Sequence, residues 1–305
     1  MKILLQKITD PAISSSGVDL FVLRLDFVHP HISGNKWFKL KYNLEEAKKQ
    51  KKDTLLTFGG AFSNHIAAVA AAGKEFGFNT IGIIRGDELG TSPRPAYDPL
   101  LKQERVEQPL NRTLRFAQEC GMKFHFVSRE QYRKKDNPDF LKRIPQLPHD
   151  HYLIPEGGTN DLAIKGCAEI TSLIDIPFDF VCCPVGTGGT LAGIISSLKN
   201  GQRAIGFSVL KGFAPTAPTT KVLETFVVGD YHFGGYAKHT PELLKFISDF
   251  EKQNNILLEQ VYTGKMMFGI YDLIRKGYFS KNSTVVAIHT GGLQGKLPRP
   301  PSERL

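Results

Sequence analysis

Short apolar runs alternate along the chain with longer amphipathic segments. The apolar runs are rich in β-branched residues and predict strands at Thr54–Phe58, Thr80–Ile84, Lys123–Val127, Phe178–Cys183, Ala204–Leu210 and Thr284–Ile288. The amphipathic segments predict helices at Asn64–Phe76, Leu110–Cys120, Pro241–Lys252 and Lys265–Lys276, with another beginning near Leu191. Apolar strands separated by helices are typical of parallel sheets that are buried on both faces. The chain is therefore predicted to be an α/β protein with open, mostly parallel sheets flanked by helices.

Three segments between or after these elements are rich in proline and polar residues. Gly86–Pro109 contains four prolines and predicts a surface loop. Lys134–Asp150 contains three prolines and predicts a second loop near a domain boundary. The C-terminal stretch GKLPRPPSERL is too polar and too rich in proline to be a core element.

The composition fits a globular protein with a large core. The chain has 305 residues and is 41% hydrophobic, which suggests about two domains. The opening residues MKILLQKITD carry charge early, so we expect no signal peptide, and no apolar run is long enough for a membrane span. We therefore expect a cytoplasmic protein that does not bind membranes.

The charge and the cysteines exclude several classes of protein. The net charge of +9 is scattered over clusters such as KYNLEEAKKQKK, which is typical of solvated helix faces. The sequence shows neither zinc-finger spacing nor an aromatic RNA-binding signature, so we expect no nucleic-acid partner and keep DNA binding as a minor alternative. None of the four cysteines forms a C-x-x-C pair, so we expect buried thiols and no metal site.

A glycine-rich turn follows the strand predicted at Phe178–Cys183. The segment PVGTGGTLAG, Pro184–Gly193, combines close-spaced glycines with the hydroxyls of Thr187 and Thr190 before a helix. Glycines permit close backbone approach, and free N–H groups at a helix start bind anions. A P-loop would need a lysine after the glycines, and a dinucleotide fingerprint would need glycine where Leu191 stands. The turn therefore predicts a phosphate or carboxylate site of another kind.

A second strand-to-helix junction reads FGGAFSNH, Phe58–His65. Ser63 and Asn64 stand where a helix N-cap belongs, and capping alone would explain one of them. Two glycines followed by Ser-Asn-His favour an additional anion cradle, in which the Asn64 amide contacts a ligand. The last predicted strand ends similarly in IHTGG, Ile288–Gly292.

Lys36 stands in a third unusual segment, SGNKWFKL. A lysine after Gly-Asn is expected to be constrained by a turn rather than to lie on a helix face. Trp37 and Phe38 can desolvate its amine and lower the pKa, as nucleophilic lysines require. Taken alone, the segment fits an exposed lysine beside core aromatics better than it fits a nucleophilic lysine.

These segments together predict pyridoxal phosphate (PLP) chemistry. PLP needs a phosphate cradle, a lysine for its imine and a cradle for the substrate carboxylate, and its ring withdraws electrons from the substrate α-carbon. A metal-dependent hydrolase would need a His/Asp/Glu cluster, and a serine hydrolase would need G-x-S-x-G. The sequence offers neither pattern.

The motifs SGNKWFKL, TFGGAFSNH, PVGTGGTLAG, YTGK at Tyr262–Lys265 and IHTGG resemble the D-cysteine desulfhydrase and 1-aminocyclopropane-1-carboxylate (ACC) deaminase family. That family belongs to the tryptophan-synthase-β-like PLP enzymes of fold type II. The resemblance implies a large domain of residues 1–43 and 158–305, a small inserted domain of residues 44–157, and PLP in the cleft between them. It also implies a small amino-acid substrate and a homodimer.

The resemblance assigns roles to individual residues. Lys36 matches the Schiff-base lysine that also moves the α-proton, and Asn64 matches the residue that bonds the phenolic oxygen of PLP. Ser63 and His65 match the substrate-carboxylate loop, with Ser63 near the reacting centre. Thr290 matches the position that faces the pyridine nitrogen. The remaining positions match the phosphate cradle and two active-site tyrosines near the substrate: Gly186, Thr187, Gly188, Gly189, Thr190, Tyr236 and Tyr262.

One position departs from the ACC deaminase pattern Y-E-G-K. Thr263 replaces the glutamate, and a neutral threonine supports the protonated pyridine nitrogen less well than a carboxylate does. The resemblance therefore favours D-cysteine desulfhydrase-like β-elimination, which gives pyruvate, ammonia and sulfide. The alternatives are ACC deaminase activity and a non-catalytic protein that binds PLP or another ligand on the same fold.

Overall fold

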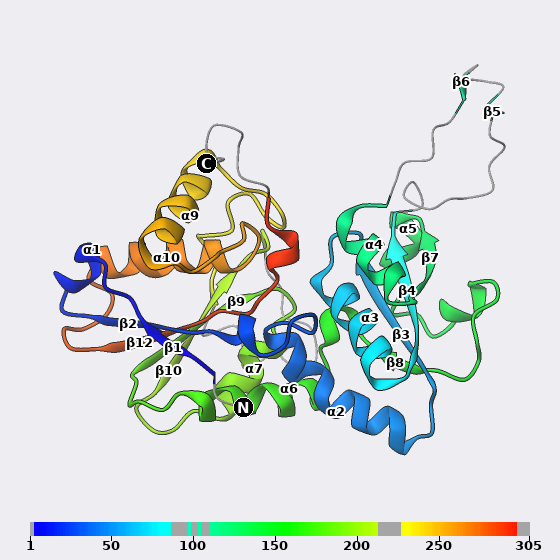
Figure 1. The fold of residues 1–305 in the computed structure, drawn as a ribbon, viewed down its shortest axis with the longest axis horizontal. Coiled ribbons are helices and arrows are strands. Elements are labelled where there is room, and N and C mark those ends of the chain that lie inside the picture. The colour runs from blue at the N-terminus through cyan, green and yellow to red at the C-terminus, as the bar shows by residue number, and fades with distance from the viewer. Residues whose placement is uncertain (1–2, 87–96, 99–102, 105–109, 213–226, 298–305) are drawn as a thin grey trace. The chain divides into compact units, whose positions relative to one another are not determined.

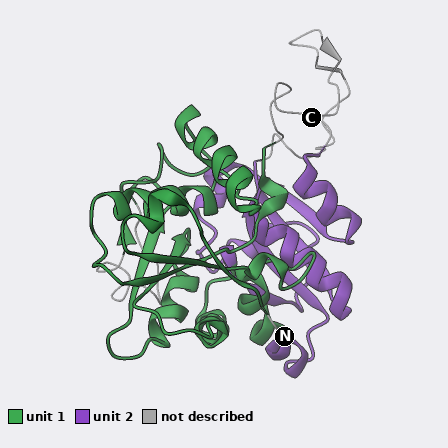
Figure 2. Cartoon of the chain, turned by 60° about the vertical axis from the view of Figure 1, so that its left-hand side comes forward, with its two compact units in different colours: residues 1–44, 158–305 green, residues 45–157 purple. Residues whose placement is uncertain are grey.

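The computed structural model describes residues 3–86, 97–98, 103–104, 110–212 and 227–297. The chain divides into two compact units, which Figure 2 shows in green and purple. Unit 1 comprises residues 1–44 and 158–305, and unit 2 comprises residues 45–157. Each unit has its own mostly parallel sheet with helices on its faces, so the predicted α/β class is confirmed.

Unit 1 contains a six-stranded sheet in the order β1-β2-β12-β9-β10-β11. All neighbouring strands are parallel except β1 and β2, which pair antiparallel. The late strand β12 therefore lies between β2 and β9 in the middle of the sheet (Figure 1). The strands are β1 (Leu5–Lys7), β2 (Asp19–Leu23), β9 (Phe180–Val185), β10 (Arg203–Ser208), β11 (Val227–Val228) and β12 (Thr284–Ile288).

Helices cover both faces of this sheet because successive strand residues point to opposite sides. Cys182 and Ala287 pack with residues of α9 and α10, whereas their neighbours Cys183 and Ile288 pack with residues of α6 and α7. Three of the four cysteines are buried, and all four are free thiols. The helices are α1 (Pro11–Ser14), α2 (Asn35–Lys49, which continues into unit 2), α6 (Asp161–Ala168), α7 (Gly189–Ser196), α9 (Pro241–Asn254) and α10 (Thr263–Arg275).

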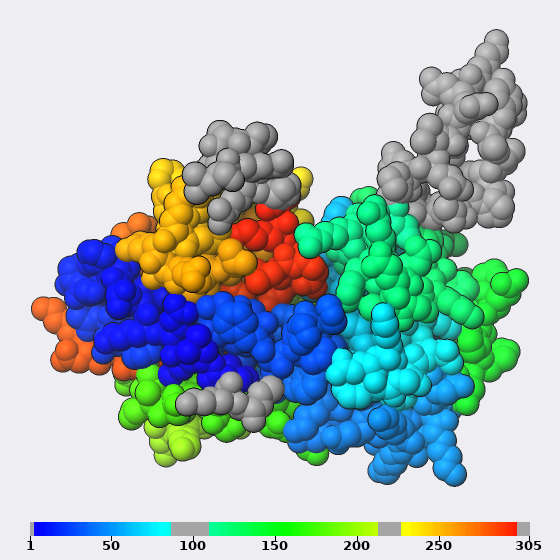
Figure 3. Space-filling view, in the orientation of Figure 1, coloured from blue at the N-terminus to red at the C-terminus, as the bar shows by residue number. Residues whose placement is uncertain are grey.

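Four short 3-10 turns complete the described part of unit 1 or adjoin it: η1 (Leu25–Phe27), η4 (Glu156–Gly158), η5 (Glu169–Leu173) and η6 (Leu293–Gly295). The segment after β12, red in Figure 3, lies against the yellow surface that α9 contributes. Lys296 pairs there with Glu251 of α9 and donates to the Leu258 carbonyl at 3.1 Å. These contacts fix the chain that leaves the glycine pair Gly291–Gly292.

Unit 2 contains a four-stranded parallel sheet in the order β7-β4-β3-β8. The strands are β3 (Thr54–Gly60), β4 (Asn79–Arg85), β7 (Lys123–Val127) and β8 (Tyr152–Ile154), and the short strands β5 (Tyr97–Asp98) and β6 (Gln103–Glu104) form a separate antiparallel pair. The helical segments are α3 (Asn64–Phe76), α4 (Arg112–Glu119), α5 (Arg129–Arg133) and η3 (Leu141–Arg143). The alanine-rich α3 begins at the N-cap Ser63 and ends at Gly77, whose φ of 77° suits a left-handed helix cap.

The predicted strands and helices lie within a few residues of those observed. The pattern missed the strands β1, β2, β8 and β11 and the helices α1, α5 and α6, and it did not recognise that α2 begins as early as Asn35. Most of the predicted loop Gly86–Pro109 and the tail after residue 297 lie outside the described residues. In the described part of the chain, no helix is both long enough and apolar enough to cross a membrane.

Candidate active site

Lys36 lies in the first turn of α2, so its expected place in a turn outside any helix was wrong. The residue before the helix, Gly34, has a φ of 66°, and a Cβ there would lie 1.8 Å from the carbonyl oxygen of Thr290. Only glycine permits this contact between the start of α2 and the loop after β12. The Asn35 N–H also donates to the Thr290 carbonyl, at 3.4 Å. The motif Gly-Asn-Lys thus starts the helix against the loop that carries Thr290.

The Lys36 amine is linked to the glycine-rich turn through its neighbour Asn35. Lys36 Nζ donates to Asn35 Oδ1 at 3.0 Å, and Asn35 Nδ2 donates to Thr190 Oγ1 at 2.7 Å. Asn35 and Thr190 are both buried. This chain of hydrogen bonds orients the lysine toward the beginning of α7, where an anion would bind.

Burial and, with a smaller effect, the positive charge of Lys39 lower the pKa of Lys36 to about 7. The Cys167 thiol and the Glu259 carboxyl act in the opposite direction with smaller effect. An ordinary lysine has a pKa of about 10.4 and is almost entirely protonated at neutral pH. Lys36 therefore carries a substantial fraction of neutral, nucleophilic amine under the same conditions.

The reactivity of Lys36 toward aldehydes is expected to rise through pH 7 in the apoprotein, because only the neutral amine attacks a carbonyl. Reductive labelling with an aldehyde and cyanoborohydride is carried out over a range of pH and followed by peptide mass spectrometry. It gives, for each lysine, the pH at which the labelling rate is half of its maximum. Lys39→Gln should move the Lys36 midpoint to higher pH, because it removes a neighbouring positive charge. The exposed Lys276 provides the internal standard, and a Lys36 midpoint equal to that of Lys276 would contradict the assignment.

Lys39 is a buried lysine on the same face of α2 as Lys36, and it was not predicted from the sequence. Its Nζ donates to Thr159 Oγ1 at 3.1 Å and to Thr187 Oγ1 at 3.5 Å, and burial lowers its pKa. Residues three apart on a helix are neighbours on one face. The spacing Lys36-x-x-Lys39 would have revealed the pair if the start of α2 had been recognised.

The glycine-rich turn after β9 forms a cradle of hydroxyl and amide donors. Gly188 has a φ of 89° and precedes the first residue of α7, Gly189, whose added Cβ would lie 2.8 Å from the Thr159 side chain. The hydroxyls of Thr159 and Thr187 lie 2.5 Å apart. Hydroxyl donors, the Lys39 ammonium and the positive end of α7 therefore meet in one place, which suits a phosphate group.

The two predicted tyrosines lie together in unit 1. The rings of Tyr236 and Tyr262 are 6.0 Å apart and meet edge to face at 72°. A Cβ added to Gly186 would lie 3.3 Å from the Tyr262 ring, so this glycine leaves room for that tyrosine beside the cradle. The structure thus brings Tyr262 to the phosphate cradle and Tyr236 to Tyr262.

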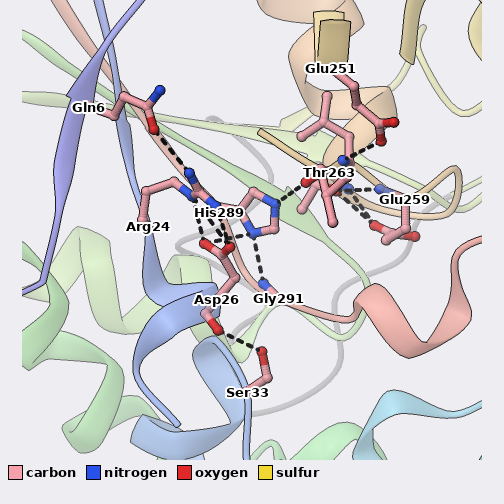
Figure 4. A network of polar contacts seen from close by, with 11 residues as sticks. Gln6, Arg24, Asp26, Ser33, Glu251, Glu259, Thr263, His289 and Gly291 are labelled. Carbon is pink, nitrogen blue, oxygen red and sulfur yellow. Dashed lines mark hydrogen bonds and ion pairs between the residues drawn. The ribbon is translucent and has the colours of Figure 1, made fainter. Parts of the chain in front are cut away.

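Thr263 is bonded to a glutamate that the sequence interpretation did not identify. The buried Glu259 carboxylate accepts from the backbone N–H groups of Val261, Tyr262 and Thr263 and from the Thr263 hydroxyl, at 2.6 to 3.1 Å. These bonds cap the start of α10, as the right side of Figure 4 shows. Burial raises the pKa of Glu259, and the backbone donors oppose this effect. Thr263 therefore supports the helix start that carries Tyr262.

A buried network holds the loop after β12 (Figure 4). His289 Nδ1 accepts from the Gly291 N–H at 3.2 Å, so its Nε2–H donates to the Leu257 carbonyl at 2.7 Å. Asp26 lies 3.4 Å from His289 and forms an ion pair with Arg24. Burial lowers the pKa of His289 although Asp26 opposes it, which favours the neutral imidazole. Thr290 lies between this histidine and Gly291, whose N–H the histidine ring binds.

Ser63, Asn64 and His65 lie in unit 2, at the start of α3. Ser63 Oγ accepts from the Ile66 N–H, so the capping role considered from the sequence is observed. The His65 ring is buried and bonds Thr57 Oγ1 at 2.8 Å, and Thr57 donates to the Ile154 carbonyl. Asn64 Oδ1 is buried and has no hydrogen-bond partner among the described residues. The Asn64 amide oxygen could therefore accept a hydrogen bond from a ligand.

The arrangement fits PLP by its own chemistry. Unit 1 provides a nucleophilic lysine linked through Asn35 to a glycine-threonine cradle with a nearby ammonium group. A phosphorylated aldehyde needs the lysine and the cradle together, whereas a simple anion would need only the cradle.

Comparison with known proteins gives the same result. Residues 8–291 match the family described as pyridoxal-phosphate dependent enzyme. A Pyrococcus furiosus protein named as a candidate ACC deaminase is 31% identical, with 92% of this chain and 86% of that protein covered. A mitochondrial bifunctional D-cysteine desulfhydrase/ACC deaminase of Arabidopsis thaliana is 28% identical, with 92% and 74% covered. The solved structure of an ACC deaminase homologue superposes with a TM-score of 0.77 at 26% identity, over 97% of this chain and 90% of that one.

Proposed function

The chain belongs to the pyridoxal-phosphate-dependent enzymes, and from that premise we propose that it is a lyase acting on a small amino acid, most favourably D-cysteine. The observation that carries the proposal is the partly neutral amine of Lys36, linked through Asn35 to the threonine-glycine cradle. The Arabidopsis relative whose name contains both activities supports the substrate class.

Residues of unit 1 would hold the aldehyde and the phosphate of the cofactor. Lys36 Nζ would bind its aldehyde carbon, and Thr187, Thr190, Lys39 and the N-terminus of α7 would bind its phosphate. Asn64 would contact its phenolic oxygen, and Thr290 would face its ring nitrogen. When bound, PLP supplies an electron-withdrawing ring that stabilises negative charge at the substrate α-carbon.

The protein's own residues would move the protons. With a pKa near 7, the Lys36 amine can take the α-proton and return it, because it is readily found in both protonation states at neutral pH. The hydroxyls of Tyr236 and Tyr262 would position the substrate or protonate the departing sulfur. The start of α3 at Ser63 would receive the substrate carboxylate, as helix N-termini bind anions.

The preference for D-cysteine over ACC rests on Thr263. Its hydroxyl donates a hydrogen bond to Glu259, and threonine has no carboxylate. Sulfide is a good leaving group, so its β-elimination needs less electron withdrawal than opening a cyclopropane ring. In the overall reaction the Cα–H and Cβ–S bonds break and one water is consumed, which gives pyruvate, ammonia and hydrogen sulfide.

An amino-acid panel tests the proposal. Holoenzyme is expected to release sulfide and pyruvate from D-cysteine faster than from L-cysteine, and to release less keto acid from D-serine and ACC. Sulfide, ammonia and keto acids are measured separately, since ACC would give a four-carbon keto acid without sulfide. Faster turnover of ACC would make the protein an ACC deaminase. No turnover by a protein that retains its lysine-bound cofactor would support the non-catalytic alternative.

We also propose that the protein is cytosolic and that it acts as a homodimer. The resemblance to the family implies the dimer.

A further inference from the structure

Lys265 is a completely buried lysine that has no role in the site described above. It lies in the first turn of α10 with 0% of its surface exposed. Its Nζ donates to the backbone carbonyls of His232 and Gly235, both at 2.8 Å. Burying an ammonium group is costly unless its donors are satisfied. A lysine buried in this position is therefore expected to stabilise the segment to which its ammonium group donates.

The loop that Lys265 contacts has an unusual backbone. Phe233, Gly234, Gly235 and Ala237 have φ angles of 50°, 91°, 119° and 56°. Left-handed backbone is unfavourable for phenylalanine and alanine, so contacts elsewhere must stabilise it. The loop makes two successive tight turns, in which Gly235 N–H donates to the His232 carbonyl and Lys238 N–H donates to the Gly235 carbonyl.

The carbonyls that close these two turns are the same two that Lys265 binds. Each carbonyl oxygen can accept two hydrogen bonds, one within the turn and one from the ammonium. Charge-assisted bonds are stronger than neutral ones. Lys265 therefore ties both turns of the loop to the first turn of α10.

Glu259 stabilises the charge of Lys265 within this buried setting. Burial lowers the pKa of Lys265 to about 8, and the Glu259 carboxyl raises it. Glu259 in turn accepts from the Tyr262 N–H at 2.8 Å. Two bonded groups therefore meet at the start of α10. Glu259 binds the backbone of Tyr262, and Lys265 binds the loop that contains His232 and Gly235.

Tyr236 is part of that loop. It follows Gly235 directly, lies within the second turn, and packs its ring edge to face against Tyr262. The residue is 37% exposed, so packing restrains its ring only in part. The loop backbone therefore contributes to the position of the ring.

We propose that Lys265 is a positioning residue that holds Tyr236 against Tyr262, so that the two rings form one wall of the substrate site. The inference rests on the proposed function, because it takes both tyrosines to face the amino-acid substrate. Lys265 itself touches neither substrate nor cofactor in this scheme.

Amide hydrogen exchange of the holoenzyme tests the positioning directly and needs no substrate. In Lys265→Met, which keeps the length of the side chain without its donors, the Gly235 and Lys238 amides should exchange about tenfold faster, as expected for loss of a charge-assisted hydrogen bond. Amides of α10 and β12 should be unchanged. Lys276→Met is the matched control, because Lys276 lies at the other end of α10 on the surface. Unchanged loop exchange, or equal acceleration throughout α10, would overturn the inference.

Kinetics with D-cysteine provide the second readout. Lys265→Met should raise KM more than it lowers kcat, and a double variant with Tyr236→Phe should be no worse than the more impaired single variant, since both changes act on one ring. Additive losses would refute action through Tyr236. If Lys265→Met does not fold, Lys265→Gln retains an amide donor without the charge and is examined in the same way. If the wild type turns over no amino acid, the proposed function fails while the exchange experiment still decides whether Lys265 holds the loop.

Discussion

Lys36→Ala is expected to abolish the visible absorbance of the lysine-bound cofactor and to lower kcat for D-cysteine by roughly 10²–10⁴-fold or more. The variant removes both the amine that would bind the cofactor and the group that would move the α-proton. Lys39 cannot readily replace it, because its ammonium donates to Thr159 and Thr187. Absorbance spectra after PLP addition and steady-state sulfide release measure the two effects.

Lys41→Ala is the matched control for this experiment. Lys41 lies on the same helix but pairs with Glu169 and is partly exposed, so its removal should change neither absorbance nor turnover appreciably. Borohydride reduction followed by peptide mapping identifies the modified lysine directly. A cofactor adduct on a peptide other than that of Lys36 would refute the assignment.

Gly34→Ala is expected to destabilise the protein by about 3–5 kcal/mol, at the upper end of the range for single substitutions. Left-handed backbone accounts for about 1–2 kcal/mol of this. The remainder comes from the clash of the new Cβ with the Thr290 carbonyl, from which it would lie only 1.8 Å. Relief of the clash must separate α2 from the loop after β12, so cofactor affinity should fall as well.

Gly277→Ala separates the two causes. Gly277 has a φ of 67°, nearly equal to the 66° of Gly34, but a Cβ there would have no neighbour within 4 Å. Both substitutions therefore place alanine in left-handed backbone, but only Gly34→Ala also introduces a steric clash. Urea unfolding and PLP titration of both variants measure the difference. Equal destabilisation would show that the contact with Thr290 contributes nothing.

The sheets and most helices could be predicted because buried parallel strands are apolar along their whole length. Thr54–Gly60 and Thr284–Ile288 illustrate this, since nearly every residue is buried. Short edge strands such as β1 and β11 carry too few residues to produce a pattern. The start of α2 was misplaced because Gly34-Asn35 resembles a turn, although the left-handed glycine here precedes a helix.

The candidate site was predictable where its chemistry is contiguous in sequence. The run from Gly186 to Thr190 lies within one turn, and the phosphate site proposed there was expected from local composition. Glu259, Lys265 and His289 act through backbone groups of segments that only the tertiary fold brings together. No local pattern distinguishes such a buried charged residue from one on the surface.

The position of β12 has a consequence for the order in which the protein folds during synthesis. Unit 2 is one continuous stretch of chain, so all its contacts are available once residue 157 has left the ribosome. Unit 1 lacks the strand that joins β2 to β9 until residues 284–288 have been made. The ribosome will then have translated more than a hundred further codons. The inserted unit is thus expected to mature first, and the lysine-bearing helix start acquires its Thr290 neighbour only near the end of translation.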